Sequence, residues 1–345
     1  MTPNVAAPTI AASRLSVSIK CSRRAPIEYA ILVKAPKGIG VTKLSIFCVV
    51  RNSPILRIAV AGVCAAASFG CDKLGLGGDS PTAPTPLSPG ATINYSAVGA
   101  SDANGVGSSV VCLPLVDCPN GMGYVPVAAR QLRGQGFTVN LRNLGIPTSV
   151  IGRDFQTLGQ QLGRPIEANF IESEMPFVQT DATIVTIFAG LNEINTITAA
   201  LGAGAGGSDP NGFIDAQVRA FAADYDTLLR GIAARSASAK LVILNVPNAA
   251  GMPYLTGTSL AQRQAAQRAA VGMTRTVVNP RVGANTVIVD LMCDSRSYLS
   301  STYSSDGLHP NDSGYAFIAA EVVRAITTTS YPAPQSGCPA MTLVP

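Results

Sequence analysis

The sequence has only one histidine, His309, among its 345 residues. This scarcity excludes zinc enzymes that need two or three histidine ligands. Any mechanism that requires an imidazole near neutral pH must use His309, because no other side chain titrates there when unperturbed. Asp306, three residues earlier, is a natural carboxylate to orient the ring. The alternative is that His309 belongs to a turn and merely caps the helix that follows.

Charged residues are also scarce, at 13% of the sequence against 47% hydrophobic residues. This balance suits one compact domain with a large core. The formal net charge of +5 is misleading, because residues 1–57 hold nine of the 25 lysines and arginines but one acidic residue. The rest of the chain therefore holds 16 basic and 19 acidic residues, a net charge of −3. No basic surface remains there to bind nucleic acid.

The apolar segment 58–70 is too short to span a membrane. Arg51 and Arg57 precede it and Cys71 follows it, which is the order of a secretory signal. We therefore expect a signal peptide over residues 50–71. Its end resembles a bacterial lipobox, in which Cys71 becomes the lipidated first residue. A plain secretory signal and a buried apolar helix are the alternatives.

The segments on either side of this signal have distinct expected fates. Residues 1–49 have no obvious place before a signal peptide, so we expect translation to begin near Val49 or Val50. The upstream stretch is then either outside the native protein or disordered. Residues 72–90 are rich in proline, glycine, serine and threonine. Such a composition cannot bury enough apolar surface to order itself and indicates a tether.

No C-x-x-C pair occurs among the four cysteines of the remaining chain, which argues against a zinc knuckle. These four allow three disulfide pairings and are Cys112, Cys118, Cys293 and Cys338. We favour 112–118 with 293–338, so that the second bond ties down a C-terminal tail over residues 331–345. Two disulfides indicate export, as a membrane-anchored lipoprotein or as a secreted or periplasmic protein.

Residues 91–330 alternate strand-like and helical patterns. The predicted strands are 92–98, 137–143, 183–189, 241–246 and 286–291. The predicted helices are 124–133, 155–162, 213–234, 259–278 and 312–326. The last three strands are nearly continuous β-branched and aliphatic runs, as expected of strands covered on both faces. The alternation predicts an α/β domain with three layers, α/β/α, around a five-stranded parallel sheet.

Polar or glycine-containing turns follow four of these strands. Ser101 follows the first, Gly145 the second, Asn192 the third, and the pair Asp306 and His309 the fifth. Each has a structural explanation on its own: a turn, a strand-to-loop glycine or a helix cap. In a parallel sheet, however, ligands bind beyond the carboxyl ends of the strands. The joint occurrence of these residues therefore indicates one site.

With these residues the chain resembles the SGNH (GDSL-type) hydrolase family over roughly residues 91–328. The serine, glycine and asparagine of the family's blocks match Ser101, Gly145 and Asn192, the last within Gly-Leu-Asn-Glu. The family's D-x-x-H block matches Asp306 and His309. The resemblance implies a flavodoxin-like sheet, and the leader implies a bacterial secreted or lipoprotein member.

One departure from the family lies beside the serine. The first block usually reads Gly-Asp-Ser, whereas here Ala100 precedes Ser101 and Asp102 follows it. Because the serine Oγ and backbone amide carry the chemistry, we expect activity to survive this change. The change weakens any inference about the substrate.

These residue types predict a carboxylic ester hydrolase that works through an acyl-enzyme. His309 acts as the base that activates Ser101 and then as the acid for the leaving group. Asp306 holds the ring and stabilises the imidazolium. The oxyanion is met by the N–H groups of Ser101 and Gly145 and by the side-chain amide of Asn192. No cofactor or metal is expected.

The expected substrate is a small-molecule, glycan or lipid ester, and the residue pattern does not choose among them. An acyltransferase that uses the same acyl-enzyme is one alternative. A non-catalytic carbohydrate-binding protein on the same fold is another. We expect membrane contact only through a lipid anchor at Cys71.

The expected start of translation can be checked by mass spectrometry of the native protein. If translation begins near Val49 or Val50, no peptide from residues 1–40 will be found. Detection of such a peptide would overturn this prediction.

Overall fold

The structure is a computed structural model that describes residues 88, 90–116 and 118–345, all within one compact unit, residues 81–345. The predicted leader 1–49, the predicted signal 50–71 with Cys71, and almost all of the predicted tether 72–90 lie outside the described residues. All the strands, helices and core residues described below lie within residues 91–344. Residues 81–345 therefore contain the whole of the described core, and we expect them to fold as a unit.

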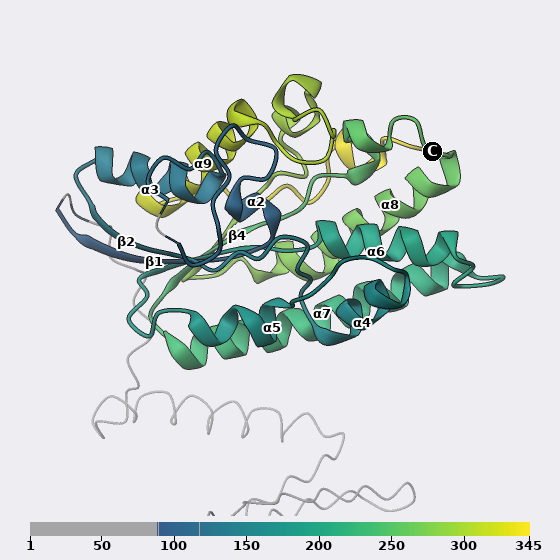
Figure 1. Ribbon diagram of the computed structural model, residues 1–345, viewed down its shortest axis with the longest axis horizontal. Coiled ribbons are helices and arrows are strands. Elements are labelled where there is room, and N and C mark those ends of the chain that lie inside the picture. Colours follow the sequence, from purple (N-terminus) through teal and green to yellow (C-terminus); the bar gives the residue numbers. More distant parts are fainter. Residues whose placement is uncertain (1–87, 89, 117) are drawn as a thin grey trace, which may run out of the picture. The chain divides into compact units, whose positions relative to one another are not determined.

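A five-stranded sheet forms the centre of the domain (Figure 1). Its strands are β1 (Thr92–Val98), β2 (Thr138–Asn143), β3 (Ile184–Phe188), β4 (Lys240–Leu244) and β5 (Thr286–Val289). They lie in the order β2-β1-β3-β4-β5, and every neighbouring pair is parallel. This confirms the predicted α/β class with a five-stranded parallel sheet.

The predicted strands 241–246 and 286–291 each extend two residues beyond the observed β4 and β5. Val246 and Leu291, at their far ends, are buried without belonging to the ladder. An apolar run marks burial, and it does not distinguish a residue in the sheet from one packed beneath the loops that leave it. The strand ends were therefore overestimated where the chain turns toward the loops.

Helices cover both faces of the sheet (Figure 1). On one face lie α3 (Tyr124–Gly134) and α9 (Asp312–Thr327), which contact each other. The other face carries α4 (Arg153–Gln161), α5 (Phe170–Ser173), α6 (Leu191–Gly202), α7 (Pro210–Arg235) and α8 (Leu260–Gly272). None of the helices that the structure describes is both long and apolar enough to cross a membrane.

One predicted helix has a different form from the one expected. The pattern over 259–278 predicts a single α-helix, but α8 ends at Gly272 and the chain continues as a π-helix, Met273–Val278. Four of these six residues are buried: Met273, Thr274, Val277 and Val278. These four positions lie on one face of the segment, which packs against the core, so the apolar pattern marks the buried face and does not distinguish an α-helix from a π-helix.

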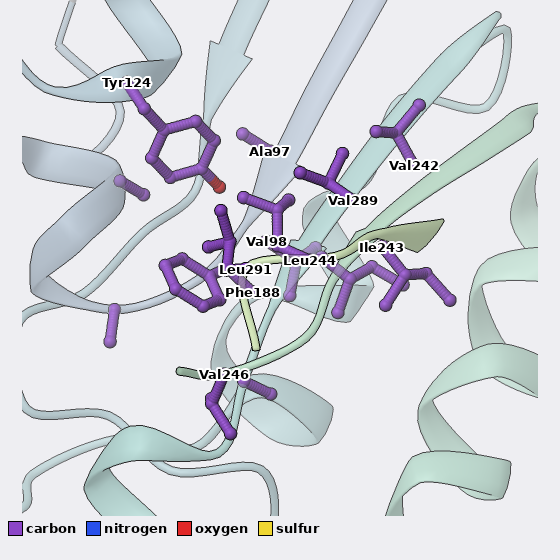
Figure 2. Close-up of a cluster of buried hydrophobic side chains, with 14 of the residues drawn as sticks. Ala97, Val98, Tyr124, Phe188, Val242, Ile243, Leu244, Val246, Val289 and Leu291 are labelled. Carbon is purple, nitrogen blue, oxygen red and sulfur yellow. The ribbon is translucent and has the colours of Figure 1, made fainter. Parts of the chain in front are cut away.

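The core lies between the sheet and its two helical layers, and Figure 2 shows the part nearest the carboxyl edge. Val98, Leu244 and Leu291 are almost completely buried there. The rings of Tyr124 and Phe188 meet edge to face, with their centroids 6.1 Å apart. Burying one such aliphatic or aromatic side chain stabilises the fold by about 1.5–3 kcal/mol. This packing fixes the strand ends from which the polar residues project.

Both expected disulfides are present, Cys112–Cys118 and Cys293–Cys338. The second attaches the C-terminal tail, in which Met341 and Val344 are buried. The tail therefore completes the hydrophobic core as well as being covalently held.

The two disulfides should differ in their contribution to stability. Replacing both Cys293 and Cys338 by alanine opens a loop with a sequence separation of 45, against 6 for Cys112 and Cys118. By loop-closure entropy we expect losses of about 4 and about 2 kcal/mol in the free energy of unfolding. Denaturant titration of each double variant of residues 81–345 measures both values. Equal losses would contradict the loop-length account.

Candidate active site

Ser101 lies just beyond the carboxyl end of β1, as the first residue of the short helix α2 (Ser101–Asn104). The turn before it leaves little room for a side chain, because a Cβ on Gly99 would lie 3.3 Å from that of Ala103. The Gly99 N–H donates to Oε2 of Glu174 at 2.8 Å. As the first residue of a helix, Ser101 has an N–H with no acceptor inside that helix.

His309 reaches Ser101 from the long loop after β5. Its Nε2 lies 2.9 Å from the Ser101 Oγ, and its Nδ1 lies 2.7 Å from Oδ2 of Asp306. When Nδ1–H donates to Asp306, Nε2 is the nitrogen that can accept the hydroxyl proton. The structure thus brings together three residues that the sequence analysis selected from opposite ends of the domain.

Asp306 also shapes the loop that carries His309. Its Oδ1 accepts the backbone N–H groups of Leu308 and His309 and the hydroxyl of Ser304. Partial burial alone would raise the pKa of Asp306, but the hydrogen bonds from the His309 ring and from this backbone lower it to about 2. The carboxylate is therefore charged at neutral pH and suited to stabilise an imidazolium.

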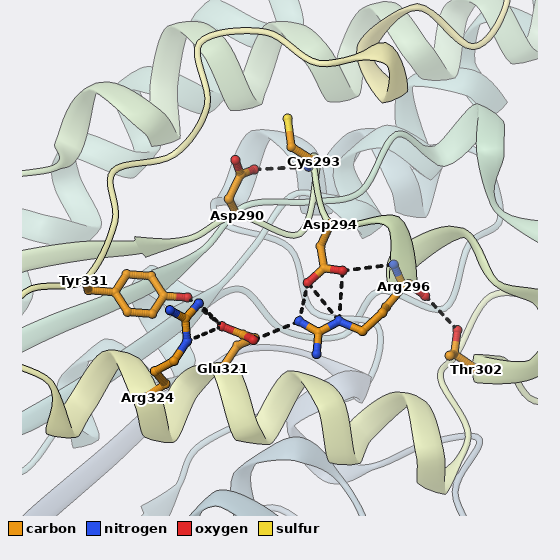
Figure 3. Close-up of polar contacts among 8 residues, drawn as sticks. All are labelled: Asp290, Cys293, Asp294, Arg296, Thr302, Glu321, Arg324 and Tyr331. Atoms are coloured by element: carbon orange, nitrogen blue, oxygen red, sulfur yellow. Dashed lines mark hydrogen bonds and ion pairs between the residues drawn. The ribbon is translucent and has the colours of Figure 1, made fainter.

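An ion-pair network fixes the start of the same loop (Figure 3). The Arg296 guanidinium lies 2.6 Å from Asp294 and 2.8 Å from Glu321 of α9. The hydroxyl of Thr302 donates to the backbone carbonyl of Arg296 at 3.2 Å. Single exposed pairs contribute little to stability, but a network with shared partners restrains geometry more firmly. The loop is thereby tied to α9 before it reaches His309.

Asn192 is the second residue of α6, immediately after β3. Its side-chain amide donates to the Ser149 carbonyl at 2.9 Å, which fixes the amide, and its second N–H hydrogen has no acceptor among the residues that the structure describes. Gly190, at φ +126°, precedes the helix, and its N–H is bound by the Glu193 carboxylate at 2.9 Å. The helix start is thus capped by Glu193, so the cap explanation for Asn192 is wrong.

Gly145 lies in a different environment from the one expected. Its N–H donates to Oδ1 of Asn143 at 3.2 Å. A Cβ at this position would lie 2.6 Å from that of Ala103 and 3.0 Å from the Ala100 carbonyl oxygen. The glycine is therefore required for close packing under α2. Its N–H is taken up by the Asn143 side chain, whereas the sequence analysis predicts that it meets the oxyanion.

Ser101, Asn192 and His309 line one cavity, with an apolar wall formed by Phe170, Phe188, Leu191 and Leu308. A second, mostly apolar cavity adjoins it and shares Asp102, Phe188, Leu191 and Leu308. Its further apolar lining includes Met252, Leu291, Tyr303, Phe317 and Ile318. Asp102, the residue after the serine, stands at the junction of the two cavities.

Two buried glutamates support the site and were not foreseen. Glu174 binds the Gly99 N–H and accepts the Ser149 hydroxyl at 3.0 Å, so it links the serine turn to the loop after β2. Glu193 binds the backbone N–H groups of Ile151 and Gly190. Burial raises the pKa of Glu174 well above its usual range and that of Glu193 to about 7. The position of Glu193 directly after Asn192 was the only sequence signal for either residue.

Asp102 is a third buried acid. Burial raises its pKa, and the nearby His309 opposes that shift. It is only 8% exposed. The imidazole of His309 thus lies near two carboxyl groups, that of Asp306 at Nδ1 and that of Asp102 beside the serine.

A sequence model of the GDSL-like lipase/acylhydrolase family matches residues 97–317, well over half of the chain. The chain belongs to this family. The matched range of this GDSL-like hydrolase includes Ser101, Asn192, Asp306 and His309. None of the curated proteins compared with the hydrolase matches it.

Several solved structures resemble this GDSL-like hydrolase in fold. The lipase Lip_vut3 from a goat rumen metagenome is 15% identical, with a TM-score of 0.48, and the match covers 69% of this chain and 100% of that one. An extracellular lipase from Streptomyces rimosus is 18% identical, with a TM-score of 0.48 and coverage of 68% and 100%. The esterase EstA from a Pseudoalteromonas species is 16% identical, with a TM-score of 0.39 and coverage of 68% and 96%.

The raised pKa of Glu193 predicts how stability varies with pH. The pKa of Glu193 is about 7 in the folded state, against the ordinary value of 4.5 expected in the unfolded state. Between these two pH values the folded state keeps a proton that the unfolded state has released, so raising the pH favours unfolding. Stability should therefore fall between about pH 4.5 and pH 7. In Glu193→Gln we expect this fall to shrink by about 3 kcal/mol.

Chemical denaturation of residues 81–345 at pH 5 and pH 8 measures this difference. The exposed Glu172, replaced by glutamine, is the matched control and should not flatten the fall, because its pKa is lowered by hydrogen bonds from Asn169 and Arg153. An unchanged slope in Glu193→Gln would show that Glu193 is not the titrating group.

Proposed function

We propose that this GDSL-like hydrolase is a serine esterase that cleaves carboxylic esters through an acyl-enzyme. The proposal rests on two contacts of the His309 ring. Its Nε2 lies 2.9 Å from the Ser101 Oγ, and its Nδ1 lies 2.7 Å from the Asp306 Oδ2. A hydroxyl within hydrogen-bond reach of a base that a third group orients is the arrangement of an activated nucleophile.

The reaction has two halves. The Ser101 Oγ bonds to the ester carbonyl carbon while its proton moves to Nε2 of His309. As the tetrahedral intermediate collapses, the ester C–O bond breaks and Nε2 gives the proton to the leaving alcohol. Water then attacks the acyl-enzyme with His309 again as base, and the serine leaves with the proton. Asp306 keeps Nδ1 protonated and stabilises the imidazolium at each stage.

The oxyanion of the tetrahedral intermediate needs donors on the side of Ser101 away from His309. We assign this role to the Ser101 N–H and to the uncommitted hydrogen of the Asn192 amide, since Asn192 and Ser101 line the same cavity. Gly145, the third predicted donor, is left out because its N–H is engaged with Asn143. Losing one preorganised donor typically slows turnover by about 10²–10³-fold.

The second cavity supports a place for the acyl chain. Its lining is mostly aliphatic and aromatic, and it shares Phe188, Leu191 and Leu308 with the cavity at Ser101. An apolar acyl group there would leave water together with these side chains, which favours binding. We therefore propose an apolar acyl group for the substrate, carried by a small-molecule, glycan or lipid alcohol, and the chain-length assay below measures the preferred length of that acyl group.

Two alternatives share parts of this proposal. An acyltransferase would use the same acyl-enzyme and differ only in the acceptor, so added alcohol would yield acyl-alcohol in place of acid. A carbohydrate-binding protein on this fold would need no base next to a hydroxyl. The contact between Ser101 and His309 favours a catalytic role over that alternative.

We also propose that the protein is exported, because both disulfides of the domain are the kind that persist in oxidising compartments. Lipidation of Cys71 is part of this proposal and rests on the sequence pattern alone.

Replacing Ser101 by alanine tests the proposal directly. We expect release of p-nitrophenol from acetate, butyrate and octanoate esters by residues 81–345 to fall by more than about 10³-fold, because the nucleophile is removed. Ser305→Ala, an exposed serine of the His309 loop, is the matched control and should keep full activity. Equal activity in the Ser101 variant and the parent protein would refute a Ser101 acyl-enzyme.

Acid should inhibit hydrolysis. A protonated His309 cannot accept the Ser101 proton, so kcat/KM should fall in acid. Asp306→Asn removes the carboxylate that fixes the ring and should lower kcat by about 10⁴-fold. Initial rates on the butyrate ester between pH 4 and pH 9 measure the profile. Activity that stays constant down to pH 4 is incompatible with His309 as the base.

A further inference from the structure

Half of the exposed large hydrophobic side chains in the described residues come from one short stretch, residues 110–116. They are Val110, Val111, Leu113, Leu115 and Val116, each between 41% and 69% exposed. The other five, Phe177, Leu260, Val282, Leu299 and Leu343, are single residues spread along the chain. Scattered apolar residues are normal on a protein surface, whereas a contiguous group usually marks an interaction site.

The backbone holds these side chains in their exposed positions. The Cys112–Cys118 disulfide closes the loop. The N–H of Cys112 donates to the Asn104 carbonyl at 2.8 Å, and that of Leu115 to the Asn143 carbonyl at 3.0 Å. Leu115 has φ +62°, a left-handed conformation that a leucine rarely adopts. Such strained positions concentrate at functional sites, and here the strain leaves a leucine 61% exposed.

The low charge of this loop and its paired backbone groups both favour contact with an apolar environment. Asp117 is the only charged residue between positions 103 and 129. Several polar groups of the loop are already paired: the Val110 carbonyl accepts the Met122 N–H, and Arg130 binds the carbonyls of Pro119 and Gly121. Paired backbone groups can enter an apolar phase without the cost of a lost hydrogen bond.

We propose that residues 110–116 dock the domain on the surface of a lipid bilayer. Five aliphatic side chains are too few for a stable protein interface, which takes about 20–30 residues a side. The segment also lacks the tyrosine, tryptophan and arginine residues that anchor such interfaces. A fluid lipid surface can be bound without shape complementarity. Aliphatic side chains enter it with a free energy that is roughly proportional to the apolar area they remove from water.

The predicted segments before the domain also favour a lipid bilayer as the partner of residues 110–116. The predicted lipidation site, Cys71, is followed by the predicted 19-residue tether 72–90. A flexible chain of that length spans roughly 25 Å on average. If Cys71 is lipidated, the tether keeps residues 110–116 within reach of the bilayer, where even a weak apolar contact is favoured by high local concentration.

Docking would also bring the lipid surface to the catalytic histidine. Gly107, three residues before the segment, packs so closely that a Cβ would lie 2.7 Å from the Cβ of His309. The hydroxyl and N–H of Ser109 bind the Asp312 carboxylate, both at 2.7 Å, at the start of α9. The segment is thus attached rigidly to the loop that presents His309.

Sedimentation with phosphatidylcholine vesicles tests the proposal. Residues 81–345, which lack Cys71, should bind these vesicles, and binding should be insensitive to salt. Leu113→Asn with Leu115→Asn should weaken partitioning at least about tenfold. The matched control, Leu260→Asn with Leu343→Asn, changes two similarly exposed leucines elsewhere and should bind like the parent protein.

A failure of the docking proposal can be told apart from a failure of the proposed esterase function. Vesicle binding is measured without turnover, and p-nitrophenyl acetate hydrolysis is measured without lipid. The loop variant should hydrolyse p-nitrophenyl acetate at the parental rate, which shows that it is folded. Absence of vesicle binding by the parent, or equal binding by the loop variant, would overturn the proposal. So would a dimer, detected by light scattering, that the loop variant dissociates, because the occupant would then be a second copy of the chain.

Discussion

All five strands of the sheet run parallel, and the candidate site depends on this constraint. Their carboxyl ends meet at one edge, so residues separated by about 90 positions become neighbours when their strands pair. Ser101 follows β1 and Asn192 follows β3, which pair in register from Tyr95 with Ile184 to Val98 with Ile187. β5 is an edge strand two places from β3, and the long loop that follows it turns tightly around Asp306 and brings His309 to the serine. Strand pairing thus sets the positions of Ser101 and Asn192, and the side-chain hydrogen bonds of Asp306 place His309.

Buried acids complete this assembly at a cost in stability. Glu174 and Glu193 lie beneath the site and hold backbone N–H groups of Gly99, Ile151 and Gly190. Removing a carboxyl group from water disfavours its charged form, and the hydrogen bonds offset only part of that loss. In return, the turns that carry Ser101 and Asn192 are fixed at several points. The buried glutamates thus make the edge of the sheet rigid and at the same time make the stability of the fold decrease as the pH rises.

The molecule uses its apolar residues in two different ways. Most are packed around the sheet, and the helical layers cover both of its faces. Residues 110–116 depart from this rule, because a disulfide and inward hydrogen bonds keep aliphatic side chains out of the core. A sequence pattern cannot distinguish apolar residues of the core from those exposed in residues 110–116, because the residue types are the same in both places. Only the tertiary contacts show which side of the surface each one occupies.

The sequence by itself determined the α/β class and the parallel sheet and selected Ser101, Asp306 and His309, and it left three disulfide pairings of which the favoured one is present. These follow from local composition, strand-helix alternation and the scarcity of histidine, which are properties of short segments and counts. Tertiary structure alone decided that Gly145 packs under α2, that Glu193 caps α6 in place of Asn192, and that Glu174 reaches the serine turn. Each of these depends on contacts between segments distant along the chain, whose distances and burial no local pattern encodes.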